Sequence, residues 1–471
     1  MKRILFACLL LIATKGYSQN TYYWVGGTAA TTSITIAANW NTAINGSGTT
    51  RSSSTNAADI LIFDGSNVGG ATPATGAVTV MANGSITCAE IRLVNNANIS
   101  FIRNSTGTST ITISGGAGDD FFVDAGCSFS IPITTAGSLR FAMAATCTGR
   151  VSGSVSMVTT QQARFDNTTG GVPGSFVFTT GSSFYTNITA TSSSYAFGGN
   201  TQSSEKWVVF EDGSNLYYDG GYSPVSNVST FSAVQFNPGS TWHQRATVMG
   251  GGSFFNRRNF GNIIIENGGV LTADGPIYRI SNLTINTGCS FITHTSGQTA
   301  VVGSIVCDGT LSAPVASTNE ILMAGNTAQT ISGAGTINAG SLIVGASANV
   351  LLSKNIGVDQ VAIINGKINF TNKQLTGNAT FNAEGIITPI TGTGNTTTGT
   401  YIISGNVGIT GTSRGQLISG AGIPANTVIV GISTTLDSLY ISNALTASAT
   451  GVALTVTTPG ATLETANTNG V

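Results

Sequence analysis

The chain has 471 residues, a formal net charge of −1 and 8% charged residues, against about 25% in an ordinary soluble domain. Hydrophobic residues at 41% exclude a disordered chain, and the lack of a basic excess argues against nucleic-acid binding. With 61 glycines and few Leu, Glu, Lys or Arg, the composition favours a β-rich extracellular protein over a helical bundle.

Residues 1–18 have the pattern of a signal peptide. A basic start at Lys2 and Arg3 precedes an apolar run over 4–14, and small residues stand at Gly16 and Ser18. We expect cleavage before Gln19. A lipoprotein signal at Cys8 is the alternative, but few apolar residues precede that cysteine. The apolar run is shorter than the roughly 20 residues of a membrane span, so we expect an exported protein, extracellular or at the cell surface, without a transmembrane segment.

Residues 19–66 form an aromatic opening segment. It contains YYWVGG (22–27), ANW (38–40) and ADILIFDG, which ends at Gly65. Spaced aromatic anchors before a first full strand suit a cap that covers the open edge of a stacked β structure. We therefore predict an N-terminal cap over 19–66.

A weak repeat then runs through the chain. It consists of an apolar residue, two variable residues, Gly, a small residue, one variable residue and a second apolar residue. The copies are VDAGCSF (123–129), FTTGSSF (178–184), FEDGSNL (210–216), FNPGSTW (236–242), IENGGVL (265–271) and INTGCSF (285–291), with a degraded VCDGTL at 306–311. Each copy predicts a strand, a corner at Gly and the next strand.

The spacing of these glycines predicts an all-β fold, a right-handed parallel β-helix over residues 67–388. After a first interval of 55 residues, the intervals lie between 20 and 32, which suits one coil each and one unmarked coil in the long interval. One such unit cannot bury its apolar face alone and must stack on its neighbours. A string of small β-sandwiches is the alternative, but these would show more regular hairpin signals.

The C-terminal part differs in composition. Residues 389–400 include TGTGNTTTG and are predicted to be a linker. Residues 401–460, with SGAGIPANTVIVGI at 419–432, are predicted to be a small β-module, followed by a tail over 461–471.

Two cysteine pairs have spacings close to one predicted coil. Cys127 and Cys147 are 20 residues apart, and Cys289 and Cys307 are 18 apart. If these intervals equal one coil, each pair would stack about 4.8 Å apart, within reach of a disulfide. The alternative is that all four are buried thiols.

Acidic residues are the first candidates for chemistry. Asp119, Asp120 and Asp124 form the densest group, a possible structural calcium site; otherwise we expect no cofactor. Other acids fill the variable corner positions of the repeat, where Asx side chains bond to nearby backbone, so corner structure is the competing explanation. We assign no catalytic residue.

Residues 242–258 form the second candidate, a ligand-binding patch. Aromatic rings stack on sugar rings, and Arg pairs with carboxylate or sulfate. The alternative is a projecting loop whose aromatic residues are tucked beneath it. The patch consists of Trp242, His243, Arg245, Arg257 and Arg258, with Phe254 and Phe255 beside them, and Tyr217, Tyr218 and Tyr222 would extend it.

Two segments resemble known proteins. The opening YYWVGG…ANW…ADILIFDG is similar to the start of large secreted surface proteins of Bacteroidetes-type bacteria, which continue into parallel β-helix repeats. The segment 419–432 resembles a β-module of bacterial surface, adhesin-like and phage-fibre proteins. The first resemblance implies a cargo of type IX secretion, although no C-terminal sorting domain is visible.

These observations favour a non-enzymatic, adhesin-like β-solenoid outside the cell, associated with the outer membrane. Its expected partners are an extracellular polysaccharide or a host or matrix surface. The alternative is a polysaccharide lyase or glycoside hydrolase on the same scaffold, which would need convergent carboxylates.

Overall fold

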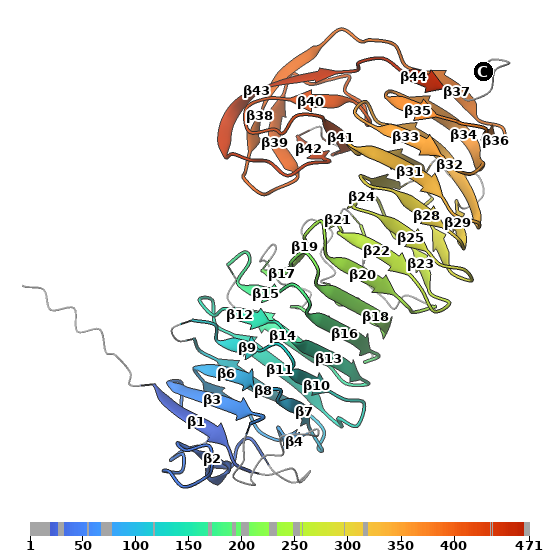
Figure 1. Ribbon diagram of the computed structural model, residues 1–471. Coiled ribbons are helices and arrows are strands. Elements are labelled where there is room, and N and C mark those ends of the chain that lie inside the picture. The colour runs from blue at the N-terminus through green and yellow to red at the C-terminus, as the bar shows by residue number, and fades with distance from the viewer. Residues whose placement is uncertain are drawn as a thin grey trace, which may run out of the picture.

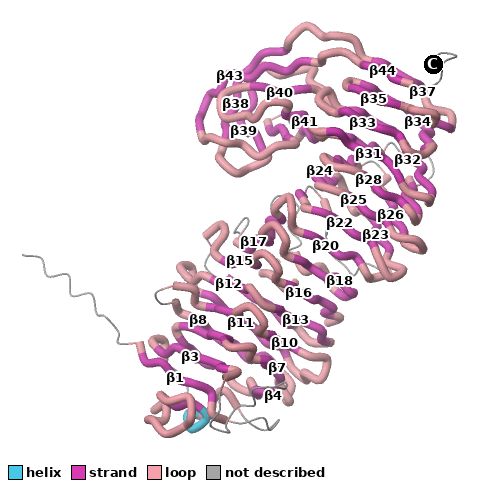
Figure 2. Tube along the Cα trace, viewed as in Figure 1, coloured by secondary structure: helices cyan, strands magenta, loops and turns pink. Residues whose placement is uncertain are grey.

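The computed structural model describes residues 19–465 except 27–32, 54–55, 67–77, 116–117, 168–171, 191–194, 199–206, 226–232, 248–254, 257, 296, 314–318, 434 and 436. The described chain is all-β apart from one short 3₁₀ helix, η1 (Ala37–Asn39). Its strands lie in rows along an elongated stack, and a separate barrel lies against the stack near its C-terminal end (Figures 1 and 2).

One sheet runs the length of the stack, and we call it the long sheet. Its 14 strands are, in order, β4 (Val78–Met81), β7 (Asn98–Ile102), β10 (Ser128–Ile131), β13 (Ser154–Thr159), β16 (Ser183–Ile188), β18 (Asn215–Gly221), β20 (Thr241–Gln244), β22 (Asn262–Ile265), β25 (Leu283–Ile285), β28 (Ile305–Cys307), β31 (Ala328–Ser332), β33 (Asn349–Leu352), β35 (Lys367–Asn369) and β44 (Thr462–Glu464).

Two sheets complete the N-terminal half. The nine-stranded N-terminal sheet contains β19 (Val234–Phe236), β17 (Val208–Phe210), β15 (Phe176–Phe178), β12 (Gly149–Val151), β9 (Phe121–Val123), β6 (Glu90–Val94), β3 (Asp59–Asp64), β1 (Asn20–Trp24) and β2 (Trp40–Asn41). The four-stranded small sheet contains β14 (Ala163–Asn167), β11 (Ser138–Met143), β8 (Thr108–Ile113) and β5 (Ile86–Cys88).

In the C-terminal half, an 11-stranded C-terminal sheet accompanies the long sheet. It contains β21 (Arg258–Asn259), β24 (Ile277–Ile280), β27 (Gln298–Val301), β30 (Glu320–Met323), β32 (Thr336–Val344), β29 (Thr310–Ser312), β26 (Ser290–Ile292), β23 (Val270–Thr272), β34 (Ile356–Ile364), β36 (Leu375–Thr376) and β37 (Thr380–Ala383).

Each strand of the stack pairs in parallel with the corresponding strand of the next stretch of chain, and we call each such stretch a coil. Phe129 lies beside Val155 in the long sheet, and farther along Ile263 lies beside Leu283. Among the named strands, antiparallel pairing is confined to β1 with β2 and to the barrel. A string of small sandwiches, whose strands pair in antiparallel fashion, is therefore excluded.

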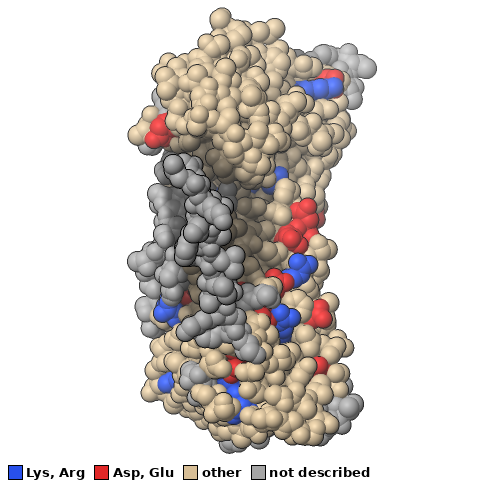
Figure 3. Space-filling view, turned by 90° about the vertical axis from the view of Figure 1, so that its left-hand side faces the viewer, with Lys and Arg blue, Asp and Glu red and all other residues tan. Residues whose placement is uncertain are grey.

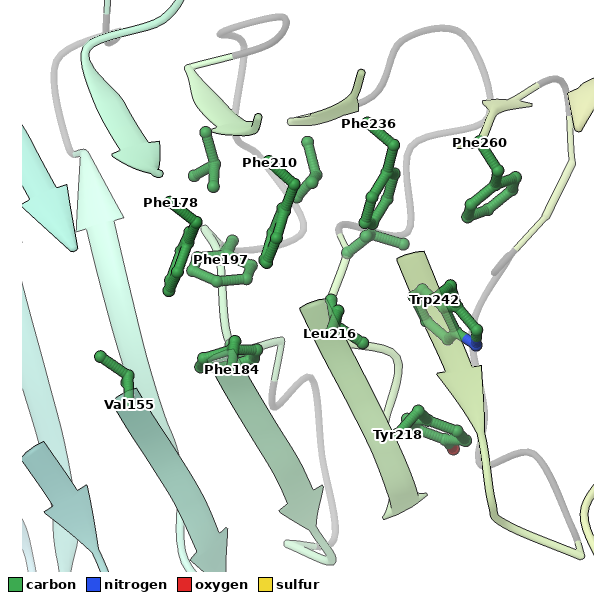
Figure 4. Close-up of a cluster of buried hydrophobic side chains, with 14 of the residues drawn as sticks. Val155, Phe178, Phe184, Phe197, Phe210, Leu216, Tyr218, Phe236, Trp242 and Phe260 are labelled. Carbon is green, nitrogen blue, oxygen red and sulfur yellow. The ribbon is translucent and has the colours of Figure 1, made fainter. Parts of the chain in front are cut away.

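Alternating side chains place a continuous apolar core inside the stack. In β16 the inward Phe184 is fully buried, whereas its neighbour Tyr185 is half-buried. Phenylalanines on successive coils stack on one another: the ring centroids of Phe178 and Phe210 are 4.4 Å apart, and those of Phe210 and Phe236 are 5.1 Å apart (Figure 4). Such stacks stabilise the coils because each ring is removed from water by the next.

Aromatic residues close the N-terminal end of this core. Trp24 meets Trp40 edge to face at 5.1 Å, and Phe63 lies within 5.4 Å of both rings. All three side chains are buried. The aromatic anchors of residues 19–66 thus pack at the end of the stack, where β2 lies on the edge of the N-terminal sheet.

The repeat glycines form corners, as expected, but not at one corner throughout. Gly126, Gly181, Gly213 and Gly239 connect the N-terminal sheet to the long sheet, since each follows one of β9, β15, β17 and β19. Gly268, Gly288 and Gly309 instead connect the long sheet to the C-terminal sheet. The corner motif therefore precedes the long-sheet strands up to β20 and follows them from β22 onward.

The unmarked coil predicted in the 55-residue interval is present. It contains β12 and β13, which lie between β9 and β15 and between β10 and β16. Its corner is short and contains Gly153. One coil in this interval therefore lacks the signature without breaking the stack.

The C-terminal module is a closed six-stranded barrel that is inserted into the stack. Its strands are β38 (Ile390–Thr396), β39 (Ile402–Val407), β42 (Ser438–Ile441), β41 (Thr427–Ile432), β40 (Leu417–Ser419) and β43 (Ala449–Thr457). The predicted linker over 389–400 is wrong, because β38 pairs with β39 and β43. The predicted tail is wrong where β44 returns to pair with β35.

The barrel packs against the outer side of the C-terminal sheet. Tyr278 of β24 stacks on Tyr440 of β42 at 3.9 Å, and Arg414 of the barrel pairs with Glu320 of β30 at 2.9 Å. Val428 and Val430 join the same buried apolar contact. Across the described ranges, no helix has the length and apolar character needed to span a membrane.

The cysteines are buried and unbridged. Cys88, Cys127, Cys147, Cys289 and Cys307 are all free thiols. The predicted disulfides are wrong because the sequence intervals differ from one coil: Cys307 lies beside Ile285 in the register, and the backbone of Cys289 accepts from Thr310. The alternative of buried thiols is confirmed.

Candidate ligand-binding surface

The predicted patch over 242–258 does not form one surface, because its Trp lies in the core. Trp242 is 1% exposed, and its Nε1 donates to Gln244 Oε1 at 3.1 Å. Phe255 and Phe260 pack against its ring at 5.4 and 5.8 Å, and Figure 4 shows it inside the aromatic core. The prediction that Trp242 presents a surface for sugars is wrong.

Arg258 is also buried. It is 3% exposed, and burial lowers its pKa to about 10, against the opposing effect of Asp274. Its predicted role as a surface ligand for anions is wrong, because its guanidinium is withdrawn from solvent. Arg257 and Phe254 lie outside the described residues.

His243 and Arg245 lie on the outer face of the long sheet. Alternation on β20 turns Trp242 and Gln244 inward and His243 outward. In register with His243 are Tyr217 on β18 and, one coil before it, Tyr185 on β16.

These three side chains stack, and we call them the aromatic ladder: Tyr185, Tyr217 and His243. The Tyr185 and Tyr217 rings are 4.5 Å apart and inclined by 7°, and the Tyr217 and His243 rings are 4.3 Å apart and inclined by 24°. Tyr217, which was predicted to extend the patch, lies beside His243. Tyr218 is fully buried and does not.

Arg245 is held over the ladder by two carboxylates. Its Cζ lies 4.2 Å from the centre of the Tyr217 ring, its Nε is 2.8 Å from Glu266 Oε1, and its Nη1 is 3.7 Å from Asp219 Oδ1. One cation facing two carboxylates leaves a formal charge of −1. The charge of Arg245 is therefore already neutralised by Glu266 and Asp219, and the residue is unsuited to the predicted pairing with a further carboxylate or sulfate.

His243 has a partner on each ring nitrogen. Its Nδ1 is 3.2 Å from Glu266 Oε1, and its Nε2 is 3.2 Å from Asn215 Oδ1. Burial lowers the pKa of His243, and this effect outweighs the opposing pull of Glu266. The neutral imidazole therefore dominates at neutral pH, and because it carries a single N–H it donates to only one of these two oxygens.

Tyr185 presents the unstacked end of the ladder. One side of its ring meets Tyr217, and on the other side its register partner is Ser156 of β13. Ser130 and then Ser100 lie in register with Ser156 on the preceding coils, and the hydroxyl oxygens of Ser100 and Ser130 are 2.6 Å apart. Because serine side chains are short, the ring face of Tyr185 borders a low hydroxyl-lined strip.

The three predicted calcium ligands do not converge. Asp120 is 1% exposed, and its Oδ2 accepts from the backbone N–H of Thr148 at 2.7 Å. Asp124 Oδ1 accepts from the N–H of Ala125 at 2.8 Å. Within the described ranges, no three His, Cys, Asp or Glu side chains gather as a metal site, so the prediction for Asp119, Asp120 and Asp124 is wrong.

The alternative explanation of corner structure is confirmed for several acids. Asp212 Oδ1 accepts from the N–H of Gly239 on the next coil at 2.7 Å, and Asp308 Oδ1 accepts from the N–H of Ala334 at 2.8 Å. These carboxylates connect adjacent coils through hydrogen bonds to the backbone.

Tyr185 was missed at the sequence level although a signal for it exists. The residue directly after each of three repeat copies is Tyr185, Tyr217 or His243. An alignment of the copies that included one further residue would have placed these three side chains at the same repeat position.

Charged residues make up only 8% of the chain. In the face shown in Figure 3, Lys, Arg, Asp and Glu form small groups of both signs on a surface made of other residues. Comparison of this chain with protein-family models, with curated proteins and with solved structures finds no match.

Proposed function

We propose that this protein is a secreted or cell-surface structural protein, a right-handed parallel β-helix that serves as a rigid stalk in adhesion. Export by residues 1–18 and type IX secretion belong to the same proposal, on the resemblances described above. The parallel strands and the shared core support it, because stacked coils resist bending along their length.

The stalk contacts neutral glycans through the aromatic ladder. The observation that carries this part is the outward column of Tyr185, Tyr217 and His243, which ends in an unstacked Tyr185 ring face beside Ser156. An aromatic face next to hydroxyl groups matches a sugar ring, which has an apolar face and a polar rim. The formal charge of −1 around Arg245 favours a neutral sugar over an acidic one.

A glycan array tests the ladder with Tyr185→Ala and Tyr217→Ala. We expect Tyr185→Ala to reduce binding to neutral glycans about tenfold, since stacking contributes about 1–3 kcal/mol per ring. We expect Tyr217→Ala to reduce it as well, because it removes the ring that supports Tyr185. Tyr23→Ala is the matched control, because Tyr23 is a half-buried tyrosine on β1 of another sheet. Equal binding by all three variants and the unsubstituted protein would refute the ladder as the contact.

A polysaccharide lyase is the second candidate, because Tyr217, His243 and Arg245 lie together: Tyr and His can transfer protons, and Arg can neutralise a negative charge. Burial, with Tyr185 and Glu266, raises the pKa of Tyr217, which disfavours it as a base at neutral pH. Assays for unsaturated products on a polysaccharide panel decide the question. Turnover that disappears in both Tyr217→Phe and His243→Gln would show that the protein is an enzyme and refute the proposed stalk function.

A further inference from the structure

Two arginines lie side by side on a different face, that of the small sheet. Arg140 of β11 is the direct register partner of Arg164 of β14. Their side chains are 29% and 22% exposed, while the neighbouring Leu139 and Phe141 point into the core. The pleat therefore turns both guanidinium groups outward from adjacent strands, which are separated by about 4.8 Å.

A single carboxylate serves both cations. Asp166 Oδ2 lies 2.6 Å from Arg140 Nε and 3.2 Å from Arg164 Nε. Asp166 is 5% exposed and lies two residues after Arg164 on the same strand. The three groups carry a formal charge of +1, and within the described chain neither guanidinium forms another ion pair.

This arrangement favours an anion in front of the pair. Two like charges on adjacent strands repel each other, and the one carboxylate offsets this only in part. Asp166 lies closest to the Nε atoms of both groups, which leaves the terminal Nη donors of both planar groups for a ligand. Planar guanidinium groups match the geometry of carboxylate and sulfate oxygens, which lysine does not.

We propose that Arg140 and Arg164 bind a sulfate or carboxylate group carried by an acidic polysaccharide. The same outer face presents hydroxyl side chains that can bond to sugar hydroxyls: Thr108, Thr110, Thr112 and Ser138. Thr110 is the register partner of Arg140, so the hydroxyl groups lead directly to the charged pair. This site is independent of the aromatic ladder, whose formal charge has the opposite sign.

Binding of dextran sulfate and carboxymethyl-dextran, with neutral dextran as reference, tests the proposal by titration calorimetry. We expect Arg140→Gln and Arg164→Gln each to weaken binding of a charged polymer about tenfold, the loss of one charge-assisted hydrogen bond. Arg150→Gln, an exposed arginine on β12, is the charge-matched control and should change binding far less. An equal loss in Arg150→Gln would mean general attraction by positive charge and overturn the site.

The variant Arg140→Lys/Arg164→Lys separates a shaped site from charge alone. It keeps the formal charge but removes the planar forks, so we expect affinity close to that of the Gln variants. Full affinity in the Lys variant overturns the proposal. Inorganic sulfate at the same concentration of sulfate groups is a further arm: competition equal to that of dextran sulfate would overturn the polysaccharide as the source of the anion.

A measurement on the unsubstituted protein covers the case in which a variant fails to fold. Phenylglyoxal modifies accessible arginines, and peptide mass mapping locates the modified positions. We expect dextran sulfate to protect Arg140 and Arg164 and to leave Arg150 reactive. Modification of Arg140 and Arg164 at the same rate with and without the polymer would contradict the proposal.

Discussion

At the scale of single residues, the buried Glu90 links stability to pH. Its pKa is raised by burial first and by Asp120 and Asp119 in addition, against the effect of Arg92, whose Nε is 2.6 Å from it. The folded protein thus holds the Glu90 proton more tightly than the unfolded chain does. Its stabilising contribution is complete below the ordinary Glu pKa of 4.5 and is lost as pH rises through the folded pKa.

Glu90→Gln keeps the side chain neutral at every pH. We therefore expect the stability of this variant, relative to the unsubstituted protein, to improve between pH 4 and pH 7, measured by urea unfolding. Glu464→Gln is the control, because it removes a partly exposed partner of Lys367, and surface pairs contribute about 0–1 kcal/mol. A difference that is the same at both pH values would contradict the expectation.

Neighbouring residues on β20 should differ sharply in their contribution to stability. Trp242→Ala removes a buried ring from the aromatic core and should destabilise the protein by about 3–5 kcal/mol. His243→Ala changes an outward ring, so we expect about 1 kcal/mol or less. Denaturant unfolding monitored by circular dichroism measures both, and equal losses would show that the strand is oriented differently.

At the scale of elements, the corners of the coils differ in what they tolerate. A Cβ on Gly153 would lie 2.2 Å from the carbonyl oxygen of Cys127 and 2.4 Å from that of Asp124, on the preceding coil. Gly181 has open space around it but a φ of +83°. Gly181→Ala should therefore cost only the backbone strain of about 1–2 kcal/mol, whereas Gly153→Ala must also separate two coils.

Thermal unfolding of the two glycine variants compares these effects directly. We expect the midpoint of Gly153→Ala to fall further than that of Gly181→Ala. The reverse order would mean that the close approach of the two coils at Gly153 is absent in solution.

The sequence predicts the local corner better than its place in the fold. Strand, glycine and strand were recognisable in FNPGSTW and in IENGGVL because turn chemistry is local. The sheet that the first strand joins depends on contacts with the neighbouring coil, which the motif does not encode. For this reason the move of the corner between Gly239 and Gly268 was not foreseen.

The candidate site was predicted less well than the fold, for a related reason. His243 and Arg245 were found by local density and Tyr217 by the expected stacking of coils. The density criterion also selected Trp242 and Arg258, which are buried. Inward or outward direction follows from strand register, and one residue of shift exchanges the two faces. Likewise β38 reads as a linker by its Gly and Thr content and becomes a strand only because β43 pairs with it.

At the scale of the whole molecule, the barrel and the stack have separate cores that meet at a small apolar contact. Tyr440→Ala removes the ring that stacks on Tyr278. We expect faster hydrogen exchange in the barrel strands β41 and β42, with the unfolding of the stack unchanged when followed by tryptophan fluorescence. The four tryptophans report on the stack alone, since Trp24, Trp40, Trp207 and Trp242 all lie there.

Val407→Ala is the matched control for this prediction. Val407 lies on β39 of the same barrel and is 66% exposed, so its loss should leave exchange unaffected. A joint shift of fluorescence and exchange in Tyr440→Ala would mean that the barrel and the stack unfold as one unit.

The path by which the chain enters and leaves the barrel has a consequence for modularity. Ile390 near the start of β38 pairs with Val456 near the end of β43, so the two connections to the stack emerge next to each other. The barrel should therefore affect the stability of the stack no more than a short loop between β37 and β44 would, because a folded insert with adjacent ends costs little closure entropy. Another compact domain with neighbouring termini should therefore be exchangeable at this position while β44 still pairs with β35 and closes the final coil.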